Sequence, residues 1–207
     1  MKRAFALLLL LLFVATSSKG GGLQIVKIDT DHQSFVFSAA SGKPLMFRYW
    51  GARLSEEDAG AILSACGREK SWELYPAYGG ALYTNPALTL VHADGQLTTE
   101  LVFSSCHSRQ LDENRTETII VLQDKVLPLT VELRFTAFRQ QDIVMQSVTV
   151  RNREQGPVIV RQIASAFFPL KAMSYYLTHF HGSSNAEMWL KEELLTPGIK
   201  TIDSKKG

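Results

Sequence analysis

The densest group of residues able to bind a metal is His179, His181 and Glu187. On a β-strand, residues two positions apart point to the same side, so both imidazoles can face one metal ion while the carboxylate completes the site. However, the gap to Glu187 is long and no histidine follows His181. Hydrogen-bonded or solvent-facing histidines therefore explain the pair better than a metal centre. We predict no metal ligand and no cofactor.

Aromatic residues offer a second kind of chemistry, because a flat ring flanked by polar groups suits the apolar face of a sugar. We predict Trp50, Trp72 and Tyr78 as substrate-binding residues. Trp72 lies beside Glu73 in a turn-rich stretch, 72–80, that suits neither a regular helix nor a central strand. The alternative is that each ring belongs to the core, where large aromatic side chains are usually found.

Nucleophilic catalysis has little support. The sequence contains no G-x-S-x-G nucleophile elbow, P-loop or dinucleotide fingerprint. Acidic residues are plentiful, but no pair is clearly arranged for glycoside hydrolysis. Glu56, Glu57 and Asp58 are expected to stabilise the N-terminus of a helix rather than to act as catalysts. We assign no catalytic residue.

The elements that position these residues are nearly all of β type. Residues 129–136 alternate strictly between apolar and polar, as in an antiparallel strand covered on one face. Ser55 to Asp58 resembles a capping box and Gly67 supplies a stop, so one short helix is expected over about 56–66. The fold class is therefore all-β, a large antiparallel β-sandwich with one short inserted helix. Expected strands cover 23–28, 34–38, 45–50, 87–92, 96–104, 116–123, 129–139, 142–152, 158–168 and 185–195.

Turn signals predict how the strands pair. The first three runs form a meander. Asp94-Gly95 predicts a hairpin that joins 87–92 to 96–104, and the turn at 151–157 makes 142–168 a long hairpin. In 185–195, Glu187 and Lys191 lie at helical pair spacing, but strand-like neighbours favour a strand.

The N-terminus has the features of an export signal. Lys2 and Arg3 precede the apolar run 4–14, and Ala15-Thr16-Ser17 offers a cleavage site. The run is too short to span a membrane, although an uncleaved anchor is the alternative. We predict a signal peptide over 1–17, a flexible spacer over 18–22, a sandwich domain over 23–207, and a secreted or periplasmic protein without membrane association.

Charge and cysteine content limit the partners. The chain has 22 Lys and Arg against 20 Asp and Glu; removal of Lys2 and Arg3 leaves 20 against 20, so no basic face for nucleic acid is expected. An oxidising compartment permits a Cys66–Cys106 disulfide, while two buried free thiols are the alternative.

Several motifs occur together along the chain: Tyr49-Trp50-Gly51, 75–79 before 85–87, 92–95, 147–152, and Phe180-His181-Gly182 with Glu187, Leu195, Gly198 and Ser204. Together they resemble the N-terminal β-supersandwich domain of glycoside hydrolase family 36. Their order and spacing match along nearly the whole mature chain and are most similar to exported enzymes of Bacteroidetes-type bacteria. Two departures stand out: Leu82-Tyr83-Thr84 replaces an Asp-aromatic-Arg run, and Ser184 replaces a tryptophan.

The resemblance implies an α-galactosidase, a retaining enzyme that hydrolyses terminal α-linked galactose in oligosaccharides. In that family both catalytic carboxylates lie on a following (β/α)₈ barrel. We therefore expect a chain truncated before that barrel, inactive alone, which supports and shapes the active site. The resemblance implies three partners. The first is an α-galactoside oligosaccharide, which the full-length enzyme binds, and the second is the catalytic barrel. The third is a further copy of the chain, in a homo-oligomer in which a loop of one subunit reaches the active site of its neighbour. The loop after Gly51 and the stretch 72–80 are nearest that role.

Two other functions stay open. A free-standing carbohydrate-binding β-sandwich would use the same aromatic residues. A metal-dependent jelly-roll enzyme would be built on His179 and His181.

Overall fold

The computed structural model describes residues 22–65, 72–80, 85–170, 172–183 and 186–202. The chain forms two compact units, one that ends at Pro169 and one that begins at Leu170. The predicted signal peptide and nearly all of the spacer lie outside the described residues, and so do Cys66 and the segment 82–84. None of the helices in the described part is long and apolar enough to cross a membrane.

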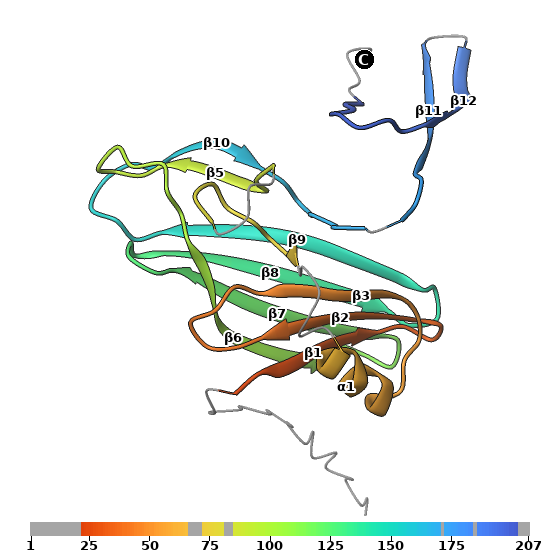
Figure 1. The fold of residues 1–207 in the computed structure, drawn as a ribbon, viewed down its shortest axis with the longest axis horizontal. Helices are drawn as coiled ribbons and strands as arrows, with labels where there is room; N and C mark the ends of the chain where they lie inside the picture. The colour runs from red at the N-terminus through yellow and green to blue at the C-terminus, as the bar shows by residue number, and fades with distance from the viewer. Residues whose placement is uncertain (1–21, 66–71, 81–84, 171, 184–185, 203–207) are drawn as a thin grey trace, which may run out of the picture. The chain divides into compact units, whose positions relative to one another are not determined.

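The first sheet contains four antiparallel strands in the order β1-β2-β3-β4 (Figure 1). The expected meander of the first three is confirmed. The fourth is a two-residue strand at the edge of this sheet, as expected for a segment that suits no central strand. The strands are β1 (Gln24–Asp29), β2 (Gln33–Ala39), β3 (Met46–Ala52) and β4 (Trp72–Glu73).

The predicted helix is present as α1 (Glu56–Ala65). Ser55 caps it, since its Oγ accepts the Asp58 N–H at 3.0 Å. The Lys27 ammonium on β1 binds Glu56 at 2.9 Å, which ties the start of the helix to the first sheet.

The second sheet is an antiparallel meander in the order β6-β7-β8-β9. Leu129, Val131, Leu133 and Phe135 are all buried and Thr130, Glu132 and Arg134 are less so, which confirms the expected alternation as far as Phe135; Thr136 is buried as well. The strands are β6 (Leu101–Gln110), β7 (Arg115–Asp124), β8 (Leu129–Phe138) and β9 (Ile143–Asn152).

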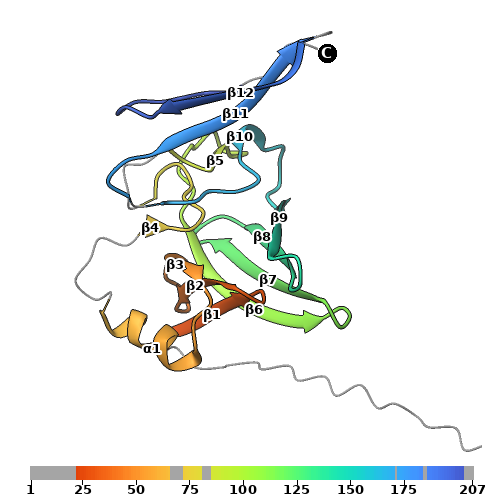
Figure 2. The ribbon, with the colours of Figure 1, turned by 90° about the vertical axis from the view of Figure 1, so that its right-hand side faces the viewer.

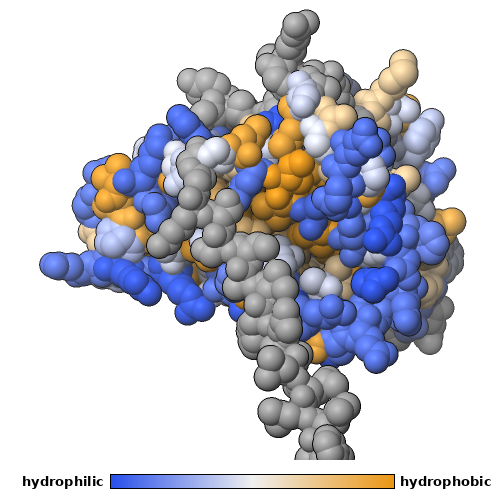
Figure 3. Space-filling model, turned by 90° about the horizontal axis from the view of Figure 1, so that it is seen from below, coloured by the Kyte–Doolittle hydropathy of each residue, from blue (hydrophilic) through white to orange (hydrophobic). Residues whose placement is uncertain are grey.

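The two sheets face each other and enclose the core, so the predicted β-sandwich is confirmed (Figure 2). Phe37 of β2 and Phe135 of β8 meet across it with ring centroids 5.6 Å apart. Seen from the side of β1, β6 and α1, hydrophilic side chains surround an apolar area near the centre of the view, and smaller apolar areas lie toward its edges (Figure 3).

Two predicted hairpins are wrong: the one that joins 87–92 to 96–104 and the one within 142–168. The turn at Asp94-Gly95 forms, with Gly95 at φ +86° and the His92 N–H bonded to the Gln96 carbonyl at 2.8 Å. However, β5 (Leu88–Val91) pairs with β10 (Ile159–Ile163), while β6 pairs with β7. The ten-residue strand β9 pairs along its whole length with β8, so the chain after it is left to join the short strand β5.

The second unit contains one antiparallel hairpin, β11 (Tyr176–Ser183) with β12 (Ala186–Leu194), which confirms a strand rather than a helix in 185–195. The pairing shifts between His181 and Ser183, and Met188 on the facing strand has φ +61°. Tyr176, Phe180, Leu190 and Leu194 are exposed on one face.

Candidate functional site

Trp50, the first predicted substrate-binding residue, lies at the edge of the core. Its ring stacks on Phe35 with centroids 4.9 Å apart and contacts Phe168 at 5.6 Å. Its Nε1–H donates to the Gln33 side-chain oxygen at 3.0 Å. Because 41% of the residue remains exposed, one part of the ring packs on the protein and another part is open to a ligand.

Trp72 lies on β4, and Tyr78 lies in the turns that follow that strand. Their exposed fractions are 40% and 48%, whereas Tyr75 between them is 2% exposed. Tyr75 is a core residue: its hydroxyl donates to the Ala164 carbonyl at 2.7 Å, and burial raises its pKa to about 12. In the part of the chain that the structure describes, no ring contact joins Trp50 to Trp72 or Tyr78.

His179 and His181 lie on β11, and their rings are 5.9 Å apart. His179 Nε2 approaches Glu193 rather than Glu187, at 3.6 Å. Across residues 22–202, outside the undescribed gaps, no three His, Cys, Asp or Glu side chains are grouped to hold a metal. The jelly-roll metalloenzyme therefore has no site among the described residues.

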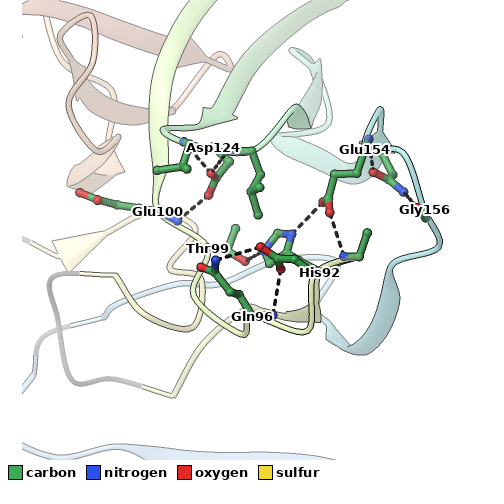
Figure 4. Close-up of polar contacts among 12 residues, drawn as sticks. His92, Gln96, Thr99, Glu100, Asp124, Glu154 and Gly156 are labelled. Atoms are coloured by element: carbon green, nitrogen blue, oxygen red, sulfur yellow. Dashed lines mark hydrogen bonds and ion pairs between the residues drawn. The ribbon is translucent and has the colours of Figure 1, made fainter.

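A buried polar group in the first unit is centred on His92, just after β5 (Figure 4). Its Nδ1 lies 2.8 Å from Glu154 Oε1, and its Nε2 lies 2.8 Å from Thr99 Oγ1. The exposed fractions of the His92 and Glu154 side chains are 0% and 5%. Glu154 also accepts the Ala93 N–H at 2.9 Å through its second oxygen, so both carboxylate oxygens are used.

The order Thr99, His92, Glu154 is that of a hydrolase triad of hydroxyl, imidazole and carboxylate. However, Thr99 is 0% exposed, and a nucleophile must reach its substrate. This arrangement therefore connects three segments of the fold and does not perform acyl transfer.

Other reactive side chains have structural surroundings. Burial raises the pKa of the Cys106 thiol to about 11, so it is protonated at neutral pH and a poor nucleophile. Glu117 lies between two arginines, 2.7 Å from Arg109 and 2.7 Å from Arg134. Burial opposes ionisation of Glu117, but these hydrogen bonds outweigh it and lower its pKa.

The ion pairs continue across the second sheet as an arginine–glutamate ladder. Arg134 also binds Glu132 at 2.6 Å, and Arg151 approaches the same carboxylate at 3.5 Å. Hydrogen bonding from Arg134 lowers the pKa of Glu132. The ladder spans all four strands, since Arg109 lies on β6, Glu117 on β7, Glu132 and Arg134 on β8, and Arg151 on β9.

The His92 group was not foreseen as a site. His92 and Glu154 are 62 residues apart, and the sequence predicted a strand ending at His92 and a turn around Glu154, without a contact between them. The available signal was a histidine directly after an apolar run and directly before the Asp94-Gly95 turn. A residue at that position, between a strand and a tight turn, is buried in the structure.

These features define a class of protein, an antiparallel β-sandwich domain whose polar groups, as far as the structure describes them, support the fold. The family follows from the sequence. Residues 43–207 match the glycosyl hydrolase family 36 N-terminal domain, and the chain belongs to that family.

Two characterised relatives are α-galactosidases. The bifunctional α-galactosidase/sucrose kinase AgaSK of Mediterraneibacter gnavus is 24% identical over 162 residues, which cover 69% of this chain and 17% of the relative. The α-galactosidase AgaA of Geobacillus stearothermophilus is 24% identical over 147 residues, which cover 64% of this chain and 20% of the relative. The chain thus spans about a fifth of the length of these relatives.

Solved structures share the fold. AgaA in complex with raffinose superposes with a TM-score of 0.74 at 19% identity, covering 88% of this chain and 29% of that one. The galactosidase domain of AgaSK gives a TM-score of 0.72 at 20% identity, covering 84% and 28%. AgaA has also been solved with stachyose, with a TM-score of 0.72 at 18% identity and coverage of 88% and 29%.

Proposed function

We propose that this chain is the N-terminal, non-catalytic domain of an exported α-galactosidase that removes terminal α-linked galactose from oligosaccharides. The observation that carries the proposal is the family match over residues 43–207. The relatives named as α-galactosidases are about five times longer than the matched segment. A catalytic region in the same polypeptide would supply the chemistry that this domain does not.

The surroundings of the reactive groups support a non-catalytic role. Retaining hydrolysis requires two carboxyl groups about 5 Å apart, one free to attack and one free to donate a proton. Glu117 and Glu132 are instead held between arginines, and Glu154 is occupied by His92 and the Ala93 N–H. We expect the purified 207-residue chain to show no turnover.

Within this proposal, Trp50, Trp72 and Tyr78 face the substrate. Each keeps between 40% and 48% of its surface exposed, which is enough for a ring to contact a sugar. Raffinose and stachyose, the ligands of the AgaA complexes, define the substrate class that we propose: oligosaccharides ending in α-galactose.

Export is part of the proposal, supported by Lys2, Arg3 and the apolar run that follows them. Amino-terminal sequencing of the protein from its source cells tests it. A mature terminus close to residue 18 is expected, and a protein that retains Met1 inside the cell would contradict export.

The test of function compares the natural gene product that contains this sequence with the 207-residue chain alone. We expect the gene product to hydrolyse raffinose and p-nitrophenyl α-galactoside and the isolated chain to hydrolyse neither. Turnover by the isolated chain, or inactivity of the gene product on every α-galactoside, would overturn the proposal. Tight α-galactoside binding by the isolated chain would favour the carbohydrate-binding alternative.

The substrate-facing residues are tested by Trp72→Ala and Tyr78→Ala in the gene product. We expect KM to rise by about tenfold with a smaller change in kcat, since each substitution removes ground-state contact with the sugar. Leu111→Ala is the matched control, because Leu111 is 40% exposed, as Trp72 is, but lies in the β6–β7 turn. Equal KM values in all three variants would remove these residues from the site.

A further inference from the structure

The main chain of Tyr78 is fixed on both sides. Its N–H donates to the Leu88 carbonyl at 2.9 Å, and its carbonyl accepts the Thr99 N–H at 2.8 Å. Gly79 follows with φ +95°, and a Cβ added there would lie 2.6 Å from Thr98 Cγ2. The turn 78–80 therefore rests against residues 98–99, and Thr99 is one of the two residues that hold the Tyr78 main chain in place.

Thr99 is in turn fixed by His92. Thr99 is 0% exposed, and its Oγ1 lies 2.8 Å from His92 Nε2. The His92 side chain is also 0% exposed, so neither group can exchange its partner for water. Loss of a hydrogen bond in such a place leaves a buried polar group unpaired, which is strongly unfavourable.

His92 is anchored to the end of the second sheet through Glu154 (Figure 4). The N–H of Glu154 donates to the Asn152 side-chain oxygen at 2.8 Å, and Asn152 is the last residue of β9. Asn152 also donates to the Gly156 carbonyl at 3.0 Å, which closes the turn that carries Glu154. A continuous line of hydrogen bonds thus runs from β9 to Tyr78.

We propose that His92 is a positioning residue for Tyr78: it transmits the rigid geometry of β9, through Thr99, to the turn that presents the Tyr78 ring. The role of this placement in substrate binding rests on the proposed function, in which Tyr78 faces an α-galactoside. The hydrogen bonds that place Tyr78 are independent of that function.

The hydrogen-bond directions give a signature that needs no variant. A carboxylate only accepts, so Nδ1 of His92 carries a hydrogen. In the neutral ring Nε2 then accepts from the Thr99 hydroxyl. We expect the ¹⁵N shifts of His92 to show the Nδ1–H tautomer in the folded chain. An Nε2–H tautomer in the neutral ring would contradict the network and overturn the proposal.

The decisive variants are Thr99→Val and Thr99→Ser in the 207-residue chain. Valine keeps the shape of threonine and removes the hydroxyl, whereas serine keeps the hydroxyl. Valine should accelerate hydrogen exchange of the Tyr78 and Thr99 amides by about tenfold, serine by much less, and neither should alter β7 and β8. Equal exchange in both variants, or a uniform rise throughout the chain, would overturn the positioning role.

Gly79→Ala perturbs the same turn from its other side. Its strained φ and the collision with Thr98 should accelerate hydrogen exchange of the Tyr78 amide. Exchange at that amide as slow as in the wild type would contradict the packing of this turn on residues 98–99.

Measurements on the natural gene product separate the two proposals. If Thr99→Val raises KM for raffinose while Thr99→Ser does not, both stand. If Thr99→Val loosens the Tyr78 amide and leaves KM unchanged, His92 is a positioning residue and the substrate role of Tyr78 fails.

Discussion

Asp142 accepts two hydrogen bonds from His32, one from the backbone N–H at 2.9 Å and one at the ring Nδ1 at 2.7 Å. His32 lies between β1 and β2, and Asp142 lies between β8 and β9 with φ +53°. Arg139 and Asp31 form a second ion pair beside them at 3.0 Å. Turns from the two sheets are therefore joined at one end of the sandwich.

This contact predicts a specific pH dependence. Hydrogen bonds from Thr30 and then His32 lower the pKa of Asp142 to about 2, and Asp142 raises the pKa of His32. The contribution of Asp142 to folding stability is present above its ordinary pKa of 3.8 and is lost as the pH falls through about 2. The contribution of His32 to folding stability is complete below its ordinary pKa of 6.5 and is lost as the pH rises through its raised pKa.

We therefore expect the contact to stabilise the fold most between pH 3.8 and 6.5. The measurement is the difference in thermal midpoint between the wild type and Asp142→Asn across pH 3 to 9. Asparagine tolerates the left-handed backbone, so the variant isolates the charge. Two curves that stay parallel over the whole range would contradict the prediction.

Phe37→Ala should destabilise the first unit by about 3–5 kcal/mol, because it removes a fully buried ring from the contact between the sheets. Urea denaturation measures this free energy of unfolding. Val126→Ala, at a side chain that is 84% exposed, should change it by less than about 0.5 kcal/mol. A similar loss in both variants would mean that the core is not where we place it.

Glu117→Gln should lower stability at neutral pH by about 1–3 kcal/mol, since charge-assisted bonds to two arginines are replaced by neutral ones. The pKa of Glu117 is lowered from 4.5. The stabilisation is therefore present above pH 4.5 and is lost as the pH falls through the lowered value. Chemical unfolding of both proteins at pH 7 and in strong acid tests this, with the exposed Glu113→Gln as control. A difference in the free energy of unfolding between the wild type and Glu117→Gln that persists unchanged in strong acid would rule out a charge-based cause.

Met188→Gly should stabilise the β11–β12 hairpin by about 1 kcal/mol, because glycine adopts φ +61° without the cost that methionine bears. Hydrogen exchange across the hairpin measures the gain as slower opening. Met188→Ala keeps the strain and should not slow exchange. If both variants behave alike, the backbone conformation at this position is not the limiting factor.

Local features of the fold could be predicted because they depend on neighbouring residues. The alternation in 129–136 predicted β8 and most of its buried face, and Ser55 to Asp58 predicted the start of α1. Partners of strands could not be predicted in the same way. A turn signal such as Asp94-Gly95 fixes the local reversal, but not whether the following residues pair with the preceding strand.

The same distinction applies to the site. Trp50, Trp72 and Tyr78 were expected to be accessible, and their exposure agrees, but their role in binding stays a prediction. The His92–Glu154 contact depends on the pairing of β10 with β5, because Glu154 lies between β9 and β10, and no short sequence window contains that pairing. Long-range polar contacts of this kind require the three-dimensional structure.

Each main sheet comes from one uninterrupted stretch of chain, residues 24–73 for the first and 101–152 for the second. Within each sheet, strands that are neighbours in space are neighbours in sequence. The connections in the second sheet are short, so the entropic cost of closing them is small, whereas the segment that contains α1 separates β3 from β4 in the first sheet. We expect the second sheet, with four strands of ten residues each, to gain structure early. The pairing of β5 with β10, separated by about seventy residues, should then set the slowest step of the refolding reaction.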